Sequence, residues 1–358
     1  MKISPELVDP PLQTTKSDED ERRRGVLLAV VYADLFDFAL SHDELLVRVI
    51  GVQLDRARLT QCLSDIGPDI LYDTGKFVCL RGRERLIRLR RRREMRARLL
   101  WKQAQRYAGW LRFVPFVRSV AVSGSLAVRN AGPTCDVDLF CITASNRLWI
   151  SRLFIVPLAR LTRRTAFFDA RLCPNYLLDE SCLRVPDENL FTAHEIVQAV
   201  PLWGKDVHTR FRHANRWTSR LLPNTAATGE TNHRVPEPPR PFLTRIVERM
   251  LLGRVGDALN RLLYSAFVQA YRARASLRGW CWMRIAPAYK LGRYTVPEGG
   301  YAGVVACLFQ RRIRKALGCS TDDAHLAPFF PPEMRNRSEV EAVYDWPGLF
   351  AGEYGSAA

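Results

Sequence analysis

The chain has 358 residues, 47% of them hydrophobic, which is ample material for the cores of two domains or three small ones. Its formal net charge is +17, which favours polyanionic partners such as nucleic acid, nucleotides or anionic lipid, unless the excess of Arg reflects a coding bias and is simply solvated. No window of 18 uninterrupted apolar residues occurs, which argues against a transmembrane helix.

The first 82 residues divide into a polar stretch and a compact unit. We expect residues 1–24 to be disordered, because they are polar and contain several prolines. Residues 25–82 predict three short helices and a hairpin, which is typical of a winged-helix domain. The expected helices are Val26–Phe38, a second from the capping box of Ser41 and Glu44 to Ile50, and Leu54–Ile66; the hairpin strands are 70–72 and 77–80.

The winged-helix pattern has two interpretations. As a DNA-binding module, its third helix would offer Arg56, Arg58 and Gln61 to a groove. As a packing or protein-contact module, it would need no such basic face. The second interpretation is favoured, because many acidic residues of the unit dilute its positive charge.

Residues 83–117 predict one long basic connecting helix. Arg81–Arg98 contains ten arginines and a narrow apolar stripe, and Trp101–Phe116 continues the helical pattern with several aromatic residues. The arginine face either binds a polynucleotide or a nucleoside triphosphate, or is a solvated face.

The most informative stretch, Ser119–Thr143, lies in the expected third unit, residues 118–222. A buried strand around Val120–Val122 ends at Gly124-Ser125, and Asp136 and Asp138 follow about ten residues later, before a second apolar run. Glycine in such a turn lets the backbone approach a ligand. Aspartates spaced i, i+2 on a strand share one face, where their negative charges favour a cation such as Mg²⁺ between them.

This order of residues resembles the signature of the DNA polymerase beta-type nucleotidyltransferase superfamily. The resemblance implies an α+β fold, with a small mixed sheet flanked by helices. It also implies that Gly124 and Ser125 hold a nucleoside triphosphate, and that Asp136 and Asp138 are catalytic and bind Mg²⁺. The alternative is a purely structural role, in which this stretch is an ordinary strand, turn, helix and strand whose aspartates cap a loop.

The sequence departs from the family pattern at the third carboxylate, which the resemblance places on a third strand. We expect a crossover helix at Ser145–Arg164, kinked at Pro157, and then strands at 167–169 and 175–178. Asn175, Asp179 and Asp169 are the candidates for the third position, and none fits the pattern well. The loss of this acid would leave nucleotide binding credible and put turnover in doubt.

The rest of the chain is less specific. Asn189–Gly204 predicts a helix, with Thr192 as its N-cap and Glu195 three residues later, and a structural role is favoured for His194. Residues 223–241 predict a linker and residues 319–358 a loosely packed tail. Between them, residues 242–318 predict a helical region whose basic amphipathic end, at Arg311–Lys315, either touches a membrane surface or is solvated.

Nine cysteines occur without a CxxC pair, mostly inside apolar runs, so we expect reduced, buried thiols and no zinc site. No signal peptide is recognisable, and we expect a cytoplasmic protein. The leading hypothesis is an enzyme that transfers a nucleotidyl group from a triphosphate to an unidentified acceptor. The alternative is a nucleic-acid-binding regulator with a degenerate, nucleotide-sensing domain, and a weaker third hypothesis is a membrane-surface accessory protein.

Overall fold

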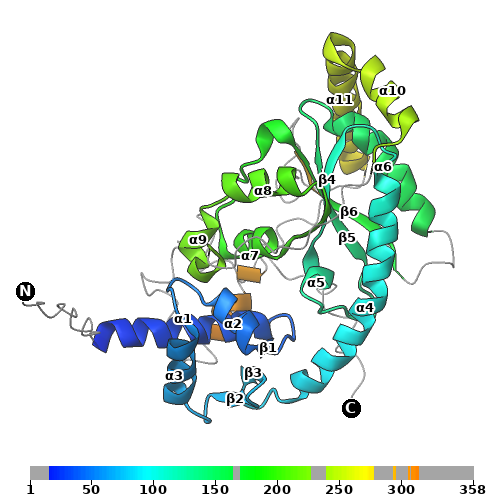
Figure 1. Ribbon diagram of the computed structural model, residues 1–358. Coiled ribbons are helices and arrows are strands. Elements are labelled where there is room, and N and C mark those ends of the chain that lie inside the picture. The colour runs from blue at the N-terminus through cyan, green and yellow to red at the C-terminus, as the bar shows by residue number, and fades with distance from the viewer. Residues whose placement is uncertain are drawn as a thin grey trace, which may run out of the picture.

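The computed structural model describes residues 16–163, 170–226, 239–277, 293–295, 305–306 and 308–313. In this part of the chain, helices combine with a three-stranded and a five-stranded sheet, so the fold is of the α+β class (Figure 1). No helix in these ranges is both long enough and apolar enough to cross a membrane.

The N-terminal unit consists of three helices and a small antiparallel sheet. The helices are α1 (Lys16–Asp34), α2 (His42–Arg48) and α3 (Arg56–Ile66), and the strands β1 (Leu40–Ser41), β2 (Leu71–Asp73) and β3 (Phe77–Leu80) pair in the order β1-β3-β2. The expected capping box begins α2, since the Ser41 hydroxyl accepts from the Glu44 amide and the Glu44 carboxylate accepts from the Ser41 amide. Asp55 caps α3 in a similar way, by accepting from the Arg58 amide.

A single helix of 27 residues, α4 (Arg85–Leu111), leads from this unit to the larger sheet, as the sequence predicts. Figure 1 shows that it runs along one side of the molecule, from the small sheet to the far end of the large one. Its C-terminal half buries a stripe that includes Leu100, Tyr107 and Leu111 against the large sheet.

The large sheet has the strand order β7-β4-β5-β6-β8. Strands β4 (Val117–Val122) and β5 (Val137–Thr143) are antiparallel and joined through the short helix α5 (Gly124–Ala127). Helix α6 (Leu148–Arg163), with Pro157 inside it, crosses over to β6 (Leu172–Asp179), which is parallel to β5. The edge strands β7 (Val200–Trp203) and β8 (Arg293–Thr295) are antiparallel to their neighbours β4 and β6.

Alternate residues of the central strands enter two different cores. Val122, Leu139 and Cys141 face the core formed with α4 and α6. Ala121, Phe140 and Ile142 face a second core, which also contains the apolar residues of α1 and of α7 (Leu190–Gln198). The N-terminal unit therefore shares one continuous core with this face of the large sheet. The helices α8 (Lys205–Ala214) and α9 (Thr218–Leu221) contribute Phe211 and Leu221 to it.

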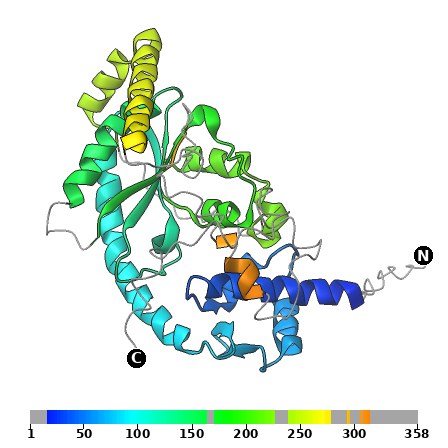
Figure 2. The ribbon, with the colours of Figure 1, turned by 180° about the vertical axis from the view of Figure 1, so that it is seen from behind.

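Two further helices, α10 (Phe242–Met250) and α11 (Gly253–Leu277), form a hairpin on the other side of the sheet, against α6. Figures 1 and 2 show this hairpin projecting from the end of the molecule opposite the N-terminal unit. The helical residues 305–306 and 308–313 return to α1, where Phe309 makes an edge-on ring contact with Tyr32 and Arg312 pairs with Asp34. Ile313 is buried in this core, and the rest of the expected basic end, 314–315, lies outside the described ranges.

Several expected boundaries were wrong. Residues 16–24 are helical rather than disordered, because Arg23 forms ion pairs with Glu19 and Asp20 of its own helix and with Asp65 of α3. The expected linker begins with an ordered 3₁₀ turn, Pro223–Ala226, in which Asn224 accepts from the Leu54 amide and donates to the Leu46 carbonyl. The expected helical region, 242–318, contains the strand β8. Residues 1–15, 227–238 and 319–358 lie outside the described ranges.

Candidate functional site

The turn between β4 and α5 meets the start of β5 at Gly124 and Asp138. Gly124 has a φ of +63°, in the left-handed region that favours glycine. A Cβ atom at this position would lie 2.6 Å from the Asp138 Oδ2 atom, so the carboxylate approaches the bare backbone. The Ser123 amide donates to the Asp138 carbonyl at 3.0 Å, which holds the turn and the strand together. The structure thus places Gly124, which is expected to hold a triphosphate, beside Asp138, which is expected to bind Mg²⁺.

Asp138 faces the side of the sheet that α7 covers. Its neighbours Val137 and Leu139 are fully buried against α4 and α6, and alternation along the strand directs Asp138 to the opposite face. Asp136 lies immediately before β5 rather than on it, and is half-buried. Both carboxylates act to raise the pKa of the Cys135 thiol, after the larger effect of its burial, so both lie near Cys135.

Ser125 lies at the exposed rim of this turn. Its Oγ atom is 3.2 Å from the Cys135 sulfur, so the loop before β5 lies close to the turn after β4. The neighbouring Ser123 side chain is only 5% exposed, and its Oγ atom has no hydrogen-bond partner within the described part of the chain. A buried hydroxyl in this state is costly unless a water or ligand satisfies it.

A carboxylate that the sequence analysis did not assign to the site, that of Glu195, reaches the same point from α7. It accepts a hydrogen bond from the Gly124 amide. Burial raises the pKa of Glu195 to about 7, and the negative charge of Asp138 adds to this effect. Three chain segments therefore converge here: the Gly124 turn, the start of β5 and the middle of α7.

Glu195 was interpreted as part of a capping box, and this was wrong. Asn189 is the N-cap of α7, with its side chain accepting from the Thr192 amide, and Glu195 lies in the body of the helix. The helix also ends at Gln198, and β7 begins at Val200, so the helix does not continue to Gly204. One signal could have identified Glu195: it is the only acidic residue in the apolar stretch 189–203.

The third strand does not supply the carboxylate that the family resemblance implies. Cys173 is the residue of β6 that pairs with Asp138, so a thiol residue stands next to the aspartate on this strand. Asp179 pairs with Thr143 at the opposite end of β5, where it accepts from the Asn146 and Ser181 amides. Asn175 is a half-buried amide, and Asp169 lies outside the described residues.

The neighbouring His194 is structural, as expected. Its ring stacks on Tyr32 of α1, with centroids 4.2 Å apart, and its Nδ1 atom is 2.9 Å from the Leu190 carbonyl oxygen. Burial lowers the pKa of His194 to about 3. A neutral, stacked imidazole thus joins α7 to the N-terminal unit.

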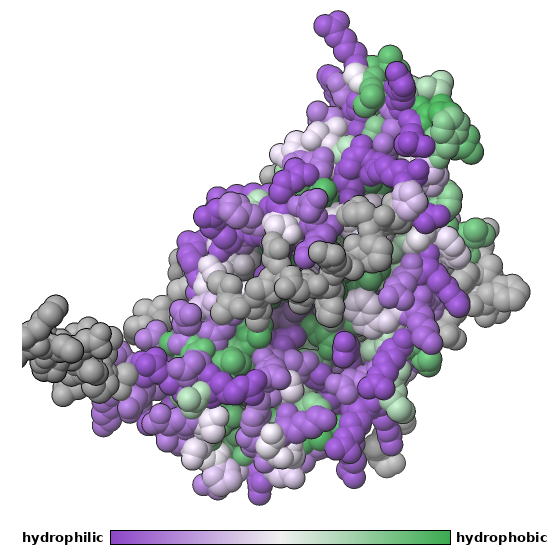
Figure 3. Space-filling view, in the orientation of Figure 1, coloured by the Kyte–Doolittle hydropathy of each residue, from purple (hydrophilic) through white to green (hydrophobic). Residues whose placement is uncertain are grey.

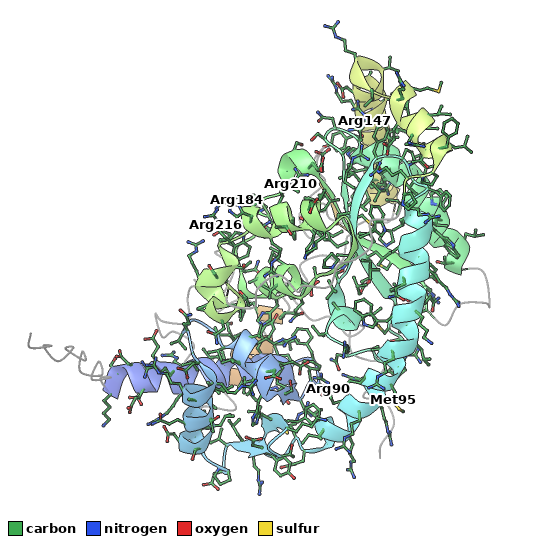
Figure 4. All side chains as sticks on the ribbon, viewed as in Figure 1. Arg90, Met95, Arg147, Arg184, Arg210 and Arg216 are labelled. Carbon is green, nitrogen blue, oxygen red and sulfur yellow. The ribbon has the colours of Figure 1, made fainter. Side chains whose placement is uncertain are left out.

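The inner arginines of α4 are bound within the protein. Arg90, labelled in Figure 4, donates to both carboxylate oxygens of Glu44, at 2.7 and 2.9 Å, and its guanidinium lies over the Phe38 ring. Arg93 donates to the Phe36 carbonyl and, at 3.1 Å, to the Asn130 side-chain oxygen in the loop after α5. These arginines therefore join the N-terminal unit to α4 and to the candidate site, whereas Arg91 and Arg92 are exposed.

The donor set is suited to a hard cation. Asp136, Asp138 and Glu195 offer carboxylate oxygens, which Mg²⁺ prefers, and Ser123 adds an unsatisfied hydroxyl. Among the described residues, no group of three His, Cys, Asp or Glu side chains is arranged to enclose a metal ion. A bound Mg²⁺ would thus need phosphate oxygens or waters to complete its coordination, as this ion commonly does.

None of the six cysteines in the described ranges forms a disulfide.

Comparison of the whole chain with models of protein families, with curated proteins and with solved structures gave no match. The function therefore has to be argued from the site.

Proposed function

We propose that the protein is a nucleotidyltransferase that moves a nucleotidyl group from a nucleoside triphosphate to an acceptor hydroxyl. The observation that carries the proposal is the convergence of the Gly124 backbone, the Asp138 carboxylate and the Glu195 carboxylate at one point. An ordinary loop-capping aspartate would gain nothing from a second, half-buried carboxylate beside it. A site that binds a cation and a phosphate would gain from both.

The strand order supports the same proposal. A strand, a Gly-Ser turn, an antiparallel strand with the aspartates and a parallel third strand reached by a crossover helix follow the order that the resemblance to the nucleotidyltransferase superfamily implies. In the proposed roles, the Gly124 turn and the Ser125 hydroxyl orient the phosphates, and Asp136 and Asp138 hold Mg²⁺. When bound, that ion neutralises charge on the phosphates.

Glu195 takes the role of the missing third acid in this proposal. A carboxylate whose pKa lies near neutrality is well suited to accept the proton of an attacking hydroxyl. The hydrogen bond from the Gly124 amide places this carboxylate beside the turn that would orient the phosphates. The acceptor itself is not identified by these residues.

The test measures ligand-induced stabilisation and transfer separately. The melting temperature of the full chain should rise with Mg²⁺ plus a nucleoside triphosphate, and a hundredfold excess of ligand over its Kd stabilises by about 2.7 kcal/mol. Asp138→Asn should abolish this rise, whereas the exposed Asp69→Asn should keep it. Glu195→Gln should keep the rise and lose transfer of label from an α-³²P triphosphate to a hydroxyl-containing acceptor. The proposal would be excluded if no triphosphate tested, together with Mg²⁺, changed the melting temperature of the wild type.

The N-terminal unit bears on the alternative, a DNA-binding regulator. Its three helices and hairpin follow the winged-helix order, and Arg56, Arg58 and Gln61 are exposed on α3. Arg56, however, pairs with Asp43, and Arg58 lies 3.9 Å from Asp55, so acidic neighbours accompany both cations. We therefore favour a packing or partner role for this winged-helix-like unit. Salt-sensitive binding of duplex DNA that is lost in Arg58→Ala would favour the regulator instead.

A further inference from the structure

Helix α10 directs its apolar face away from the protein. Phe242, Leu243 and Met250 are 67%, 74% and 73% exposed, and Ile246 and Val247 are exposed as well. These residues fall on one side of the helix at the spacing of an amphipathic face. A surface helix of a water-soluble domain normally buries that side, so this helix has the reverse orientation.

The polar side of α10 fixes the helix to the protein. The Thr244 hydroxyl donates to the Phe113 carbonyl at 3.1 Å. The Glu248 carboxylate accepts from the Phe116 amide at 2.6 Å and pairs with Arg118 and Arg240. Because these bonds occupy the inner face, the outward direction of the apolar side is determined by specific contacts.

The hairpin that presents this face is anchored to α6. Arg147, labelled in Figure 4, donates to the carbonyls of Leu251 and Gly253 and pairs with Asp257. The Asn260 side-chain oxygen accepts from the Trp149 amide at 2.8 Å, at the first turn of α6. These contacts connect α11 and the turn before it to the start of α6.

The apolar surface continues beyond α10. Phe113, which follows α4, Leu252, which precedes α11, and Val255 in the first turn of α11 are each more than half exposed. Figure 3 shows hydrophobic side chains gathered at this projecting tip, with hydrophilic ones beside them. We call this surface, made by Phe113, Phe242, Leu243, Ile246, Met250, Leu252 and Val255, the apolar tip.

The exposed charged residues of α10 and of the start of α11 are all arginines. Arg245, Arg249 and Arg254 are exposed at or beside the apolar tip. The acidic residues of the same segment, Glu248 and Asp257, are half-buried and paired with arginines. Apolar side chains flanked by unbalanced arginines are complementary to the anionic headgroups and upper acyl chains of a membrane surface.

We propose that the apolar tip docks the protein onto anionic membrane surfaces, with α10 lying in the plane of the interface. The hairpin projects from the end of the described part of the protein in both opposite views, which is the position that contact with a surface requires (Figures 1 and 2). Residues such as Leu243 and Met250 enter the acyl region, and Arg245 and Arg249 contact lipid phosphates. Docking does not require nucleotide binding at the Gly124 turn.

The test is vesicle flotation with the full chain. Vesicles of phosphatidylcholine with 30% phosphatidylglycerol should bind the wild type at least about tenfold better than pure phosphatidylcholine vesicles. The double variant Leu243→Ser, Met250→Ser should reduce binding about tenfold or more, and Arg245→Gln with Arg249→Gln should reduce it severalfold. The matched control is Met95→Ser with Leu99→Ser, since these residues of α4 are also highly exposed, at 65% and 64%, but distant from the tip.

Three outcomes would overturn the proposal. The wild type could fail to bind anionic vesicles at low salt. The Leu243→Ser, Met250→Ser variant could bind anionic vesicles as well as the wild type does, which would indicate adsorption through the overall positive charge of the protein. Size-exclusion chromatography could show that the wild type forms a concentration-dependent oligomer and that the same variant stays monomeric. The tip would then be an interface between copies of this chain. Circular dichroism of each variant verifies that its helices are intact.

Discussion

At the scale of single residues, Glu195 is a carboxyl group whose environment differs strongly from that of a free side chain in water. Its pKa in the folded protein is about 7, against 4.5 for an unperturbed glutamate. Between these values the folded protein binds the proton more tightly than the unfolded chain, so the stability that this residue contributes falls as the pH rises through 7. The cause is the buried position beside Asp138, which penalises the ionised form.

Replacing Glu195 with Gln should therefore stabilise the protein above pH 7 and leave its stability nearly unchanged at pH 5. One pKa unit corresponds to about 1.4 kcal/mol, so the gain at pH 8 is expected on the order of 1–3 kcal/mol. Urea denaturation at the two pH values measures it. The control is Glu180→Gln, which removes an ion pair with the exposed Arg210 and should not stabilise the protein at pH 8. Equal effects of Glu195→Gln at both pH values would contradict the assignment of the raised pKa.

The position of Glu195 also shows where sequence reasoning reached its limit. The Gly124 turn and the aspartates follow one another within 15 residues, so local pattern could associate them. Glu195 lies 57 residues beyond Asp138 and reaches it only because α7 packs against α5 and the sheet. No local periodicity encodes that packing. Thr192 was expected to be the N-cap of this helix, but Asn189 is the N-cap.

At the scale of elements, the arginine-rich helix α4 has two distinct faces. Arg93 is buried and donates to the carbonyls of Phe36 and Asp37 and to Asn130. Arg91 is exposed two residues earlier. Arg93→Ala should cost about 2–4 kcal/mol of unfolding free energy, because it leaves buried acceptors unsatisfied. Arg91→Ala should change it by less than about 0.5 kcal/mol, as surface substitutions do.

Urea denaturation of the two single variants distinguishes these expectations. Similar losses in both would mean that α4 contributes through its overall charge and not through the contacts of Arg93. Because Arg93 is structural, the expectation that the arginine face of α4 binds a nucleoside triphosphate should be tested at the exposed Arg91 and Arg92, with Arg93 left unchanged.

The elements themselves were predicted unevenly. The three N-terminal helices, the hairpin, the long helix α4, the strand–turn–strand motif and the crossover helix α6 were all expected near their observed positions. The strands β1, β7 and β8 were not expected. Each has at most four residues and pairs with a strand distant in sequence, so long-range contacts rather than local alternation define them. Pro201 inside β7 further obscures it, although an edge strand tolerates proline.

At the scale of the whole molecule, the N-terminal unit and the large sheet share one core. Val26 and Val30 of α1 belong to the same cluster as Phe140 and Ile142 of β5. We therefore expect the full chain to unfold in urea with coincident transitions by fluorescence and far-ultraviolet circular dichroism. A fragment of residues 16–82 should fail to fold alone, because it would expose the half of the core that α7 and α9 cover. A cooperative transition of the isolated fragment would contradict this.

The loop after α5 gives this shared core a further consequence. Asn130 donates from its backbone to the Ser125 carbonyl at 2.8 Å and from its side chain to the Phe36 carbonyl at 2.9 Å. If the Ser125 turn binds a triphosphate as proposed, a partner that repositioned the 35–38 turn of the N-terminal unit would alter that affinity. Thermodynamic reciprocity then requires the converse, by the same factor: occupancy of the Ser125 turn would change how tightly the N-terminal unit binds such a partner.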